Sequence, residues 1–459
     1  MLTRPVDLAL PRCPPLPSAP TQFKSRTPAP AEVMAKLTRE ERLRKIYTEL
    51  RELATATQAD LLASIKARGF SARTMWINNS LYIKAATPAL IQELRNLKNA
   101  IEIYADTEVA RIDEPMVEQE IHEVKGGLRA QWNIELINAP AVWGNYTNGQ
   151  GVTLANIDTG VRYTHEALFA NYRGYNNGNY DHDYNWYDPR EVQFSPYDNN
   201  GHGTHTMGTS AGSAETGIGV APGAQWIAAK GCASSSCSNA DLMGSFQYLL
   251  APTRQEDYDG EGDVTKAPTV INNSWGGGRG SSTYLSYIQP HVEAGTVVVF
   301  SQGNSGSACS TANSPGDLYL VIGVGSTDSS DRLSSFSSRG PGIGTDTFPL
   351  QKPDISAPGS SVYSSYPTTD TSYATLSGTS MAAPHVTGLV ALLRAHNPSL
   401  TVDEITQILK DTATHNVGAP TGGQTTCAGV AYTDWPNYHY GYGRIDAIAA
   451  LDAAAKLRK

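Results

Sequence analysis

The chain lacks long apolar runs and any excess of positive charge, and each shortage excludes a class of protein. No run approaches the roughly 18 to 20 apolar residues that a membrane-spanning helix needs, so we expect no membrane partner. The formal net charge is −9 and the isoelectric point is near 5.6. Because no basic surface is available to neutralise phosphates, we do not expect nucleic acid as a partner either.

The N-terminus lacks the apolar core of a secretory signal peptide, since its longest apolar stretch there is Leu8-Ala9-Leu10. Residues 1–32 are instead rich in proline, as in the run PRCPPLPSAP. A segment of this composition cannot bury a core, so we expect a disordered leader over residues 1–32.

Cysteine is scarce, with five in the whole chain. Four of them lie in one expected domain and can pair in three ways. The short Ser-rich spacing within CASSSC favours a local bridge, which leaves the other two for each other; four unlinked thiols are the alternative. The same spacing, without a histidine cluster, disfavours a zinc site. The expected pairs are Cys232 with Cys237 and Cys309 with Cys427, and paired cysteines indicate an extracellular protein.

Residues 33–115 have the pattern of a small α+β domain. Thr38 and Glu41 form a capping box that opens an amphipathic helix ending near Gly69. Alternating apolar residues then predict a strand over 75–83, Thr87-Pro88 opens a second helix through residue 97, and residues 101–112 predict another strand. A polar connector over residues 116–129 follows.

Residues 130–455 have the pattern of an α/β domain. Continuous rather than alternating apolar runs suit strands that are covered on both faces, as in a parallel sheet. Two long helical patterns follow near the end of the chain, at 380–396 and 402–413. The apolar runs are 152–157, 226–230, 270–271, 297–300 and 320–324.

Three motifs place chemically active side chains at the ends of expected strands or the starts of helices. They are ANIDTGV with Asp158, NNGHGTHTMGTSAG with His202, and SGTSMAAPHVTG with Ser380. A serine hydroxyl becomes a nucleophile when a neutral imidazole accepts its proton, and a buried carboxylate orients that imidazole and stabilises its cation. The three residues therefore form a candidate catalytic triad. We interpret His205 and His385, which lie in the same motifs, as structural hydrogen-bonding residues.

The motifs DTG, HGTH and GTSMAAPH, in the chain order Asp, His, Ser, resemble the signatures of the subtilase family of serine peptidases, and GCASSSCS, SPGDLY and GYGRIDA are closest to its bacillopeptidase F-like branch. The resemblance implies a subtilisin-like three-layer fold with a central parallel sheet. It also implies an oxyanion hole from the Asn304 side chain and the Ser380 amide, and substrate binding by Ser274, Trp275, Gly276 and Gly303.

The resemblance implies a zymogen. The domain over 33–115 is similar to a subtilase propeptide, which would act as an intramolecular inhibitor until the linker over 116–129 is cut; an accessory domain is the alternative. A monomeric, secreted endopeptidase acting on proteins or peptides is expected. No cofactor is needed for the chemistry. A structural calcium ion is compatible with the acidic loops, but these loops match no EF-hand pattern, so we assign no metal ligand.

Two other functions are compatible with the same motifs. A subtilase can transfer its acyl group to an amine and so form macrocycles, although nothing in this sequence signals an added domain that excludes water. An inactive subtilase fold can serve as a binding protein, although such a protein would typically have lost a triad residue or the oxyanion asparagine.

Overall fold

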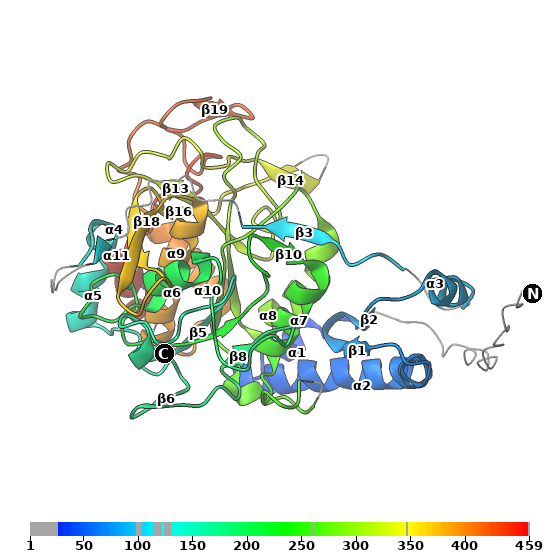
Figure 1. Cartoon of the computed structure of the whole chain (residues 1–459). Helices are drawn as coiled ribbons and strands as arrows, with labels where there is room; N and C mark the ends of the chain where they lie inside the picture. The colour runs from blue at the N-terminus through cyan, green and yellow to red at the C-terminus, as the bar shows by residue number, and fades with distance from the viewer. Residues whose placement is uncertain are drawn as a thin grey trace, which may run out of the picture. The chain divides into compact units, whose positions relative to one another are not determined.

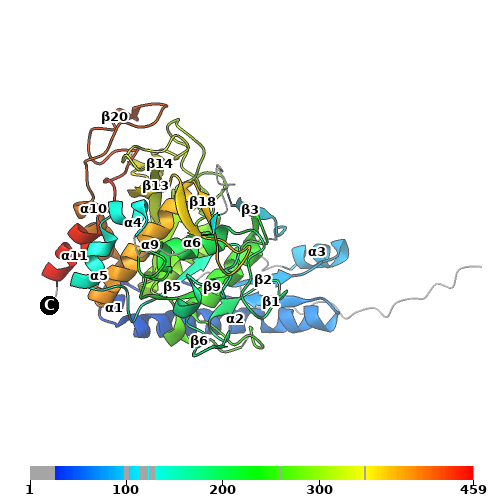
Figure 2. The same ribbon diagram turned by 60° about the vertical axis from the view of Figure 1, so that its left-hand side comes forward.

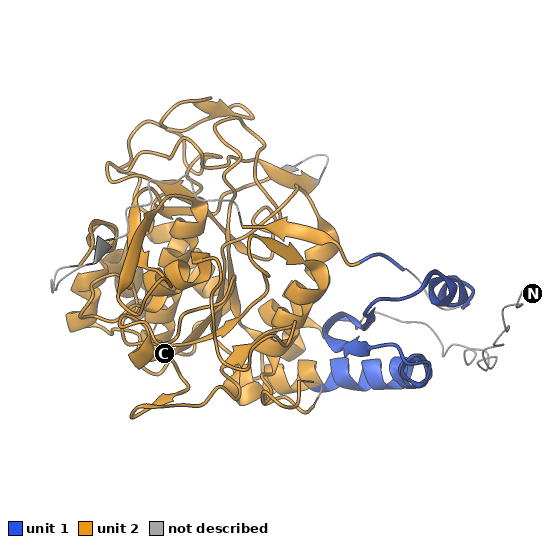
Figure 3. Cartoon of the chain, viewed as in Figure 1, with its two compact units in different colours: residues 1–28, 48–105 blue, residues 29–47, 106–459 orange. Residues whose placement is uncertain are grey.

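The fold was analysed in a computed structural model, which describes residues 26–97, 103–112, 122–123, 130–258, 260–345 and 348–457. The described chain divides into two compact units, coloured separately in Figure 3. One contains residues 26–28 and 48–105, and the other contains residues 29–47 and 106–457. Most of the expected leader lies outside the described residues, but Ala31–Met34 forms the short helix α1.

The smaller unit is built from most of helix α2 (Arg39–Ala67), a β-hairpin and helix α3 (Pro88–Arg95), which the Thr87 side chain caps. Its core contains Leu61, Ile65, Ala72, Leu90 and Leu94. Both helices match the sequence prediction.

The single strand predicted over 75–83 is wrong. The structure has strand β1 (Ala72–Met75), a turn of 3₁₀-helix and strand β2 (Ser80–Ile83), which pair antiparallel. Asn79 adopts a left-handed conformation with φ of 56°, which asparagine tolerates and which reverses the chain. Apolar alternation continued across this turn and so resembled one strand.

The larger unit is organised around a seven-stranded sheet in which every pairing is parallel. The five predicted apolar runs all lie in it, and the α/β architecture is confirmed. Two edge strands, β8 and β16, were not predicted. In spatial order the strands are β16 (Ile355–Pro358), β13 (Ile322–Thr327), β12 (Val297–Ser301), β11 (Val270–Asn273), β5 (Thr153–Ile157), β9 (Gln225–Ala229) and β8 (Trp186–Tyr187).

Helices cover both faces of this sheet and give three layers. Helix α6 (His202–Ala211) packs beside α9 (Thr379–His396), and both contact the sheet (Figures 1 and 2). Helices α7 (Asn239–Leu250) and α8 (Leu285–Ala294) form a second pair that also contacts it. The remaining helices are α4 (Trp132–Leu136), α5 (Ala139–Asn145), α10 (Val402–Thr412) and α11 (Ala447–Lys456).

Short antiparallel strands complete the unit. Of the strand predicted over 101–112, residues 101 and 102 lie outside the described residues, and within the described part the strand is β3 (Glu108–Arg111), which pairs with β10 (Ser236–Ser238). The other short strands are β17 (Val362–Ser365), β18 (Ser372–Leu376) and β4 (His122–Glu123) in one sheet, and the pairs β6 (Tyr175–Asn176) with β7 (Asn179–Tyr180), β14 (Gly342–Thr345) with β15 (Phe348–Leu350), and β19 (Thr426–Cys427) with β20 (Val430–Ala431).

Candidate active site

Asp158 lies at the carboxyl end of strand β5 and is fully buried. Its Oδ1 atom accepts a hydrogen bond from the Thr159 amide at 2.7 Å and lies 2.8 Å from Nδ1 of His202. Its Oδ2 atom accepts from the Thr206 hydroxyl at 3.3 Å. The carboxylate is therefore held by neighbours on two elements and faces the imidazole.

His202 is the first residue of helix α6, and the preceding loop fixes its place. The Asp198 carboxylate accepts from the amides of Gly201 and Thr204 at 2.8 and 2.9 Å, and so caps this end of the helix. At Gly203 an added Cβ atom would lie 2.1 Å from the carbonyl oxygen of Gly160, so only glycine allows α6 to approach the sheet this closely. Nε2 of His202 has no hydrogen-bond partner among the described residues.

Ser380 lies in the first turn of helix α9 and is 3% exposed. Its hydroxyl donates to the carbonyl oxygen of Ser274 at 3.1 Å. The hydroxyl therefore does not donate to His202 in this state. Catalytic hydrogen bonds are often long or misaligned when no substrate is being attacked, so this geometry does not remove Ser380 from the triad.

Asn304 follows strand β12 and lies against the start of helix α9. Its side-chain oxygen accepts from the Thr379 amide at 2.8 Å and from the Thr379 hydroxyl at 2.9 Å. The neighbouring Gly303 adopts φ of +104° and its amide donates to the same hydroxyl at 3.1 Å. Thr379 thus fixes the orientation of the Asn304 amide next to Ser380.

The segment Ser274–Gly276 follows strand β11 and contacts Ser380 and strand β3. The Ser274 hydroxyl donates to the Ser380 carbonyl oxygen at 2.8 Å. Trp275 is 1% exposed and its side chain donates to the Ile157 carbonyl oxygen at 2.9 Å, so the indole is not available to a ligand. Gly276 exchanges two backbone hydrogen bonds with Arg111 of β3, at 2.9 and 3.1 Å.

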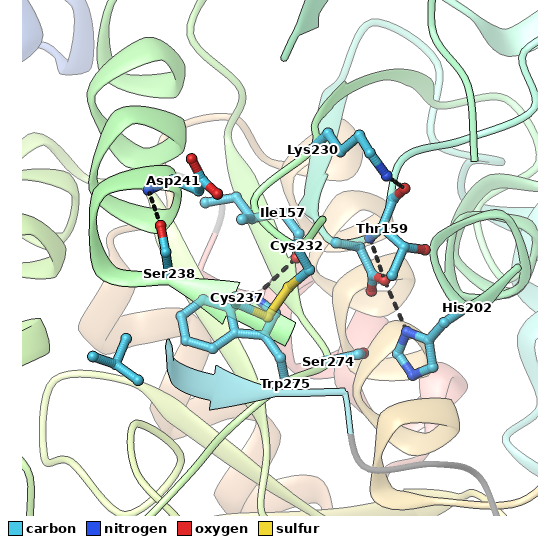
Figure 4. The surroundings of a disulfide bond; sticks show 12 residues. Ile157, Thr159, His202, Lys230, Cys232, Cys237, Ser238, Asp241, Ser274 and Trp275 are labelled. Atoms are coloured by element: carbon cyan, nitrogen blue, oxygen red, sulfur yellow. Dashed lines mark hydrogen bonds and ion pairs between the residues drawn. A yellow bond between two sulfur atoms is a disulfide. The ribbon is translucent and has the colours of Figure 1, made fainter. Parts of the chain in front are cut away.

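Sequence reasoning missed a buried lysine beside the candidate triad. Lys230 is 3% exposed, and its ammonium donates to the Thr159 carbonyl oxygen (Figure 4). It also donates to the Asn199 side chain at 2.7 Å. It also lies 4.7 Å from the centre of the Tyr197 ring. Burial lowers the pKa of Lys230, while Asp198 acts in the opposite direction. A lysine at the end of a buried apolar strand, in AAKG, was the available signal.

His205 and His385 do not contact the candidate triad through hydrogen bonds. Nε2 of His205 lies 3.0 and 3.1 Å from two carbonyl oxygens of strands β17 and β18, and burial lowers its pKa to about 3. His385 contacts Asn133 and the Met381 carbonyl oxygen at 2.8 Å each, and burial lowers its pKa to about 4. Both are neutral near pH 7.

Two disulfide bonds join the predicted partners, Cys232 with Cys237 and Cys309 with Cys427. The predicted pairing is confirmed. Within the described ranges, no group of three or more His, Cys, Asp or Glu side chains is arranged to hold a metal ion. In the same part of the chain, every helix is too short or too polar to cross a bilayer.

Comparison with known proteins identifies the family. Residues 149–443 match the model of the subtilase family. The chain is 39% identical to Bacillopeptidase F of Bacillus subtilis over 338 residues, which is 70% of this chain and 22% of that protein. It is 32% identical to Subtilisin DY of Bacillus licheniformis over 70% of this chain and 97% of that protein. The chain thus spans about a fifth of the first relative and nearly all of the second, and by its fold, motifs and sequence it belongs to the subtilase family.

Proposed function

We propose that this chain is a serine endopeptidase that hydrolyses peptide bonds through an acyl-enzyme on Ser380. The observation that carries the proposal is the buried contact of 2.8 Å between Asp158 and His202, on helix α6, which packs beside the helix that holds Ser380. In a catalytic triad, a buried carboxylate beside an imidazole orients it and stabilises its cation.

In the proposed first step, His202 accepts the Ser380 proton at Nε2 while the hydroxyl oxygen attacks the substrate carbonyl carbon. The carboxylate of Asp158 keeps the proton of His202 on Nδ1 and stabilises the imidazolium that forms. The Asn304 side-chain amide and the Ser380 backbone amide donate to the oxyanion. His202 then protonates the leaving amine and activates the water that releases the acyl group.

The way in which strand β3 is bound supports an extended peptide as the substrate. Residues 108–112 lie as an antiparallel strand between β10 and Gly276, with backbone bonds to both sides. An extended chain that is held by its backbone can be recognised in the middle of a protein, which suits an endopeptidase. This geometry supports protein or peptide substrates, and the proposed chemistry uses no cofactor.

We further propose that β3 is part of a propeptide and occupies the groove between β10 and Gly276 in which a substrate would bind. The domain over 33–115 would inhibit the enzyme, the linker over 116–129 would be cut by the enzyme itself, and residues 130–455 would form the mature peptidase. The pairing of residues 108–112 with β10 and Gly276 supports this arrangement. The two disulfide bonds support an extracellular location. We propose that the enzyme is a monomer, and we assign no calcium ligand.

Labelling with a fluorophosphonate probe tests the activity. The mature protein is expected to be labelled on Ser380 and to hydrolyse peptides, while the Ser380→Ala variant does neither. Unlabelled, inactive parent protein would instead indicate a binding protein with a subtilase fold. Incubation of a peptide substrate with added amines would distinguish the two reactions, because hydrolysis yields a free carboxylate and acyl transfer yields an amide.

A further inference from the structure

The loop between strand β9 and helix α7 is closed by a disulfide bond. We call residues 232–238 the disulfide loop. Cys232 and Cys237 are joined with their Cα atoms 4.1 Å apart, and both are fully buried. Within the bridge, the Ala233 amide donates to the Ser236 carbonyl oxygen at 2.9 Å. The loop is therefore a short closed turn with little freedom to change shape.

One end of the disulfide loop is attached to the backbone of the candidate triad. The Cys232 amide donates to the Asp158 carbonyl oxygen at 3.1 Å. Two residues earlier, Lys230 holds the Thr159 carbonyl oxygen with its ammonium, as Figure 4 shows. The Cys232 end is thus fixed by contacts that do not depend on the bridge.

The other end of the disulfide loop forms one side of the peptide groove. Cys237 pairs with Ala110 and Ser236 with Arg111, and the Ile112 amide donates to the Ser235 carbonyl oxygen at 2.9 Å. Among the described residues, the opposite side of the groove pairs with this strand through Gly276 alone. Three residues of the disulfide loop therefore pair with β3, whereas Gly276 pairs with Arg111 alone.

From this arrangement we propose that the Cys232–Cys237 bridge is a positioning device for extended substrates. It keeps the strand residues 235–238 in the peptide-binding conformation before a peptide arrives, so that binding does not have to order them. Without the bridge, every peptide that reaches this loop would bind more weakly, because part of its binding free energy would be used to order the loop. The proposal rests on the peptidase function proposed above.

A purely structural role is the competing explanation, and the other bridge makes it testable. A bridge that closes a short loop constrains the unfolded chain less than one that closes a long loop. The Cys232–Cys237 bridge spans 5 residues and the Cys309–Cys427 bridge spans 118. If disulfide bonds acted only on stability, removal of the long-range bridge would have the larger effect and neither removal would select between substrates.

The experiment compares two mature double variants, Cys232→Ser/Cys237→Ser and the matched control Cys309→Ser/Cys427→Ser, on two substrates with the same residue before the scissile bond. One substrate is a single-residue ester, which is too short to reach the disulfide loop, and the other is a tetrapeptide anilide. For the first variant, KM for the tetrapeptide should rise about 10-fold or more, with kcat and the ester kinetics changed less than about 3-fold. The control variant should lose thermal stability but keep both KM values.

Equal changes for the ester and the tetrapeptide, or an unchanged KM for both, would overturn the proposal. If the first variant does not fold, Ser234→Gly/Ser235→Gly keeps the bridge and loosens the loop, and a KM increase limited to the tetrapeptide is again required. A parent enzyme that cuts neither substrate and takes no fluorophosphonate would contradict the proposed function itself. Hydrolysis of both substrates without selectivity among the variants would contradict this inference alone.

Discussion

At the scale of single residues, the candidate site depends on side chains whose orientation is fixed by neighbours. Thr379 holds the oxygen of the Asn304 amide through its own amide and hydroxyl, at 2.8 and 2.9 Å. With the oxygen held in this way, the side-chain nitrogen is the group that can meet an oxyanion. In the proposed mechanism, Asn304 therefore contributes little to substrate binding and much to stabilisation of the transition state.

We predict that Asn304→Ala lowers kcat and leaves KM nearly unchanged. The expected loss is about 100-fold to 1,000-fold, which is the magnitude known for removal of an oxyanion-hole asparagine from a subtilisin, a relative in this family. Steady-state kinetics on a peptide anilide measure both constants. An unchanged kcat would remove Asn304 from the oxyanion hole.

At the scale of elements, the contact between helix α6 and residues 158–160, which follow strand β5, sets the distance from His202 to Asp158. The Gly203→Ala variant would place a methyl group 2.1 Å from the Gly160 carbonyl oxygen and 3.1 Å from the Asp158 Cβ atom. The helix must then move away from the sheet. We expect kcat to fall at least about 10-fold, because catalysis is sensitive to misplacement of about 1 Å.

Gly144→Ala in helix α5 is the matched control for this variant, since an added Cβ atom there meets nothing within 4 Å. Alanine has the higher helix propensity, so this change should leave kcat unchanged and stabilise the protein by up to about 1 kcal/mol. Similar activities of the two variants would show that the α6 contact does not control the site.

The Cys309–Cys427 bridge joins the segment after Asn304 to the hairpin of β19 and β20, across 118 residues. Closing so long a loop should stabilise the fold by about 3 to 5 kcal/mol if the effect is mainly on the unfolded chain. We predict a loss of that size in Cys309→Ser/Cys427→Ser, measured by urea unfolding in a Ser380→Ala background. An unchanged unfolding midpoint would mean that native strain cancels the gain.

At the scale of the whole molecule, buried neutral histidines should make stability depend on pH. Burial lowers the pKa of His205 to about 3 and those of His291, His385 and His439 to about 4, against about 6.5 in the unfolded chain. Below about pH 6.5 the unfolded chain binds protons that the folded chain does not. The contribution of these histidines to the free energy of unfolding should therefore be fully present above about pH 6.5 and fall steadily from there to about pH 4.

Unfolding of the Ser380→Ala protein by urea at a series of pH values measures this dependence. The loss should be roughly 1 to 3 kcal/mol for each histidine at the acid end. His291→Gln can retain the hydrogen bond to the Phe246 carbonyl oxygen, at 2.8 Å in the parent, without binding a proton. It should show a shallower decline, and an equally steep one would exclude His291 as a contributor.

At the same scale, we predict that the chain matures by cutting its own linker over residues 116–129. The Ser380→Ala protein, made in a host without other proteases, should stay full length, whereas the parent should yield a form that starts between about Val117 and Arg129. N-terminal sequencing of both proteins distinguishes the outcomes. Equal processing of the two would exclude self-cleavage, and a parent that stays full length yet is fully active would assign residues 33–115 to an accessory domain.

The sequence alone determined those features that are local. Apolar runs predicted the positions of five sheet strands, since a strand that is covered on both faces must be apolar throughout. The capping box of Thr38 and Glu41 marked the start of α2, because its hydrogen bonds lie within one turn. The short spacing in CASSSC favoured a local disulfide bond between Cys232 and Cys237, so Cys309 and Cys427 remained to pair with each other. The motifs also contain Asp158, His202 and Ser380, although their roles stay predictions.

Only the tertiary structure decided which distant segments meet. Arg111 pairs with Gly276, and Lys230 reaches the Thr159 carbonyl oxygen, across separations that no local pattern records. In the described part of the strand predicted over 101–112, β3 forms where β10 and Gly276 supply backbone partners. Propensity and periodicity describe a segment by itself, whereas a groove is formed by the packing of several segments and exists only once the sheet and its helices have come together.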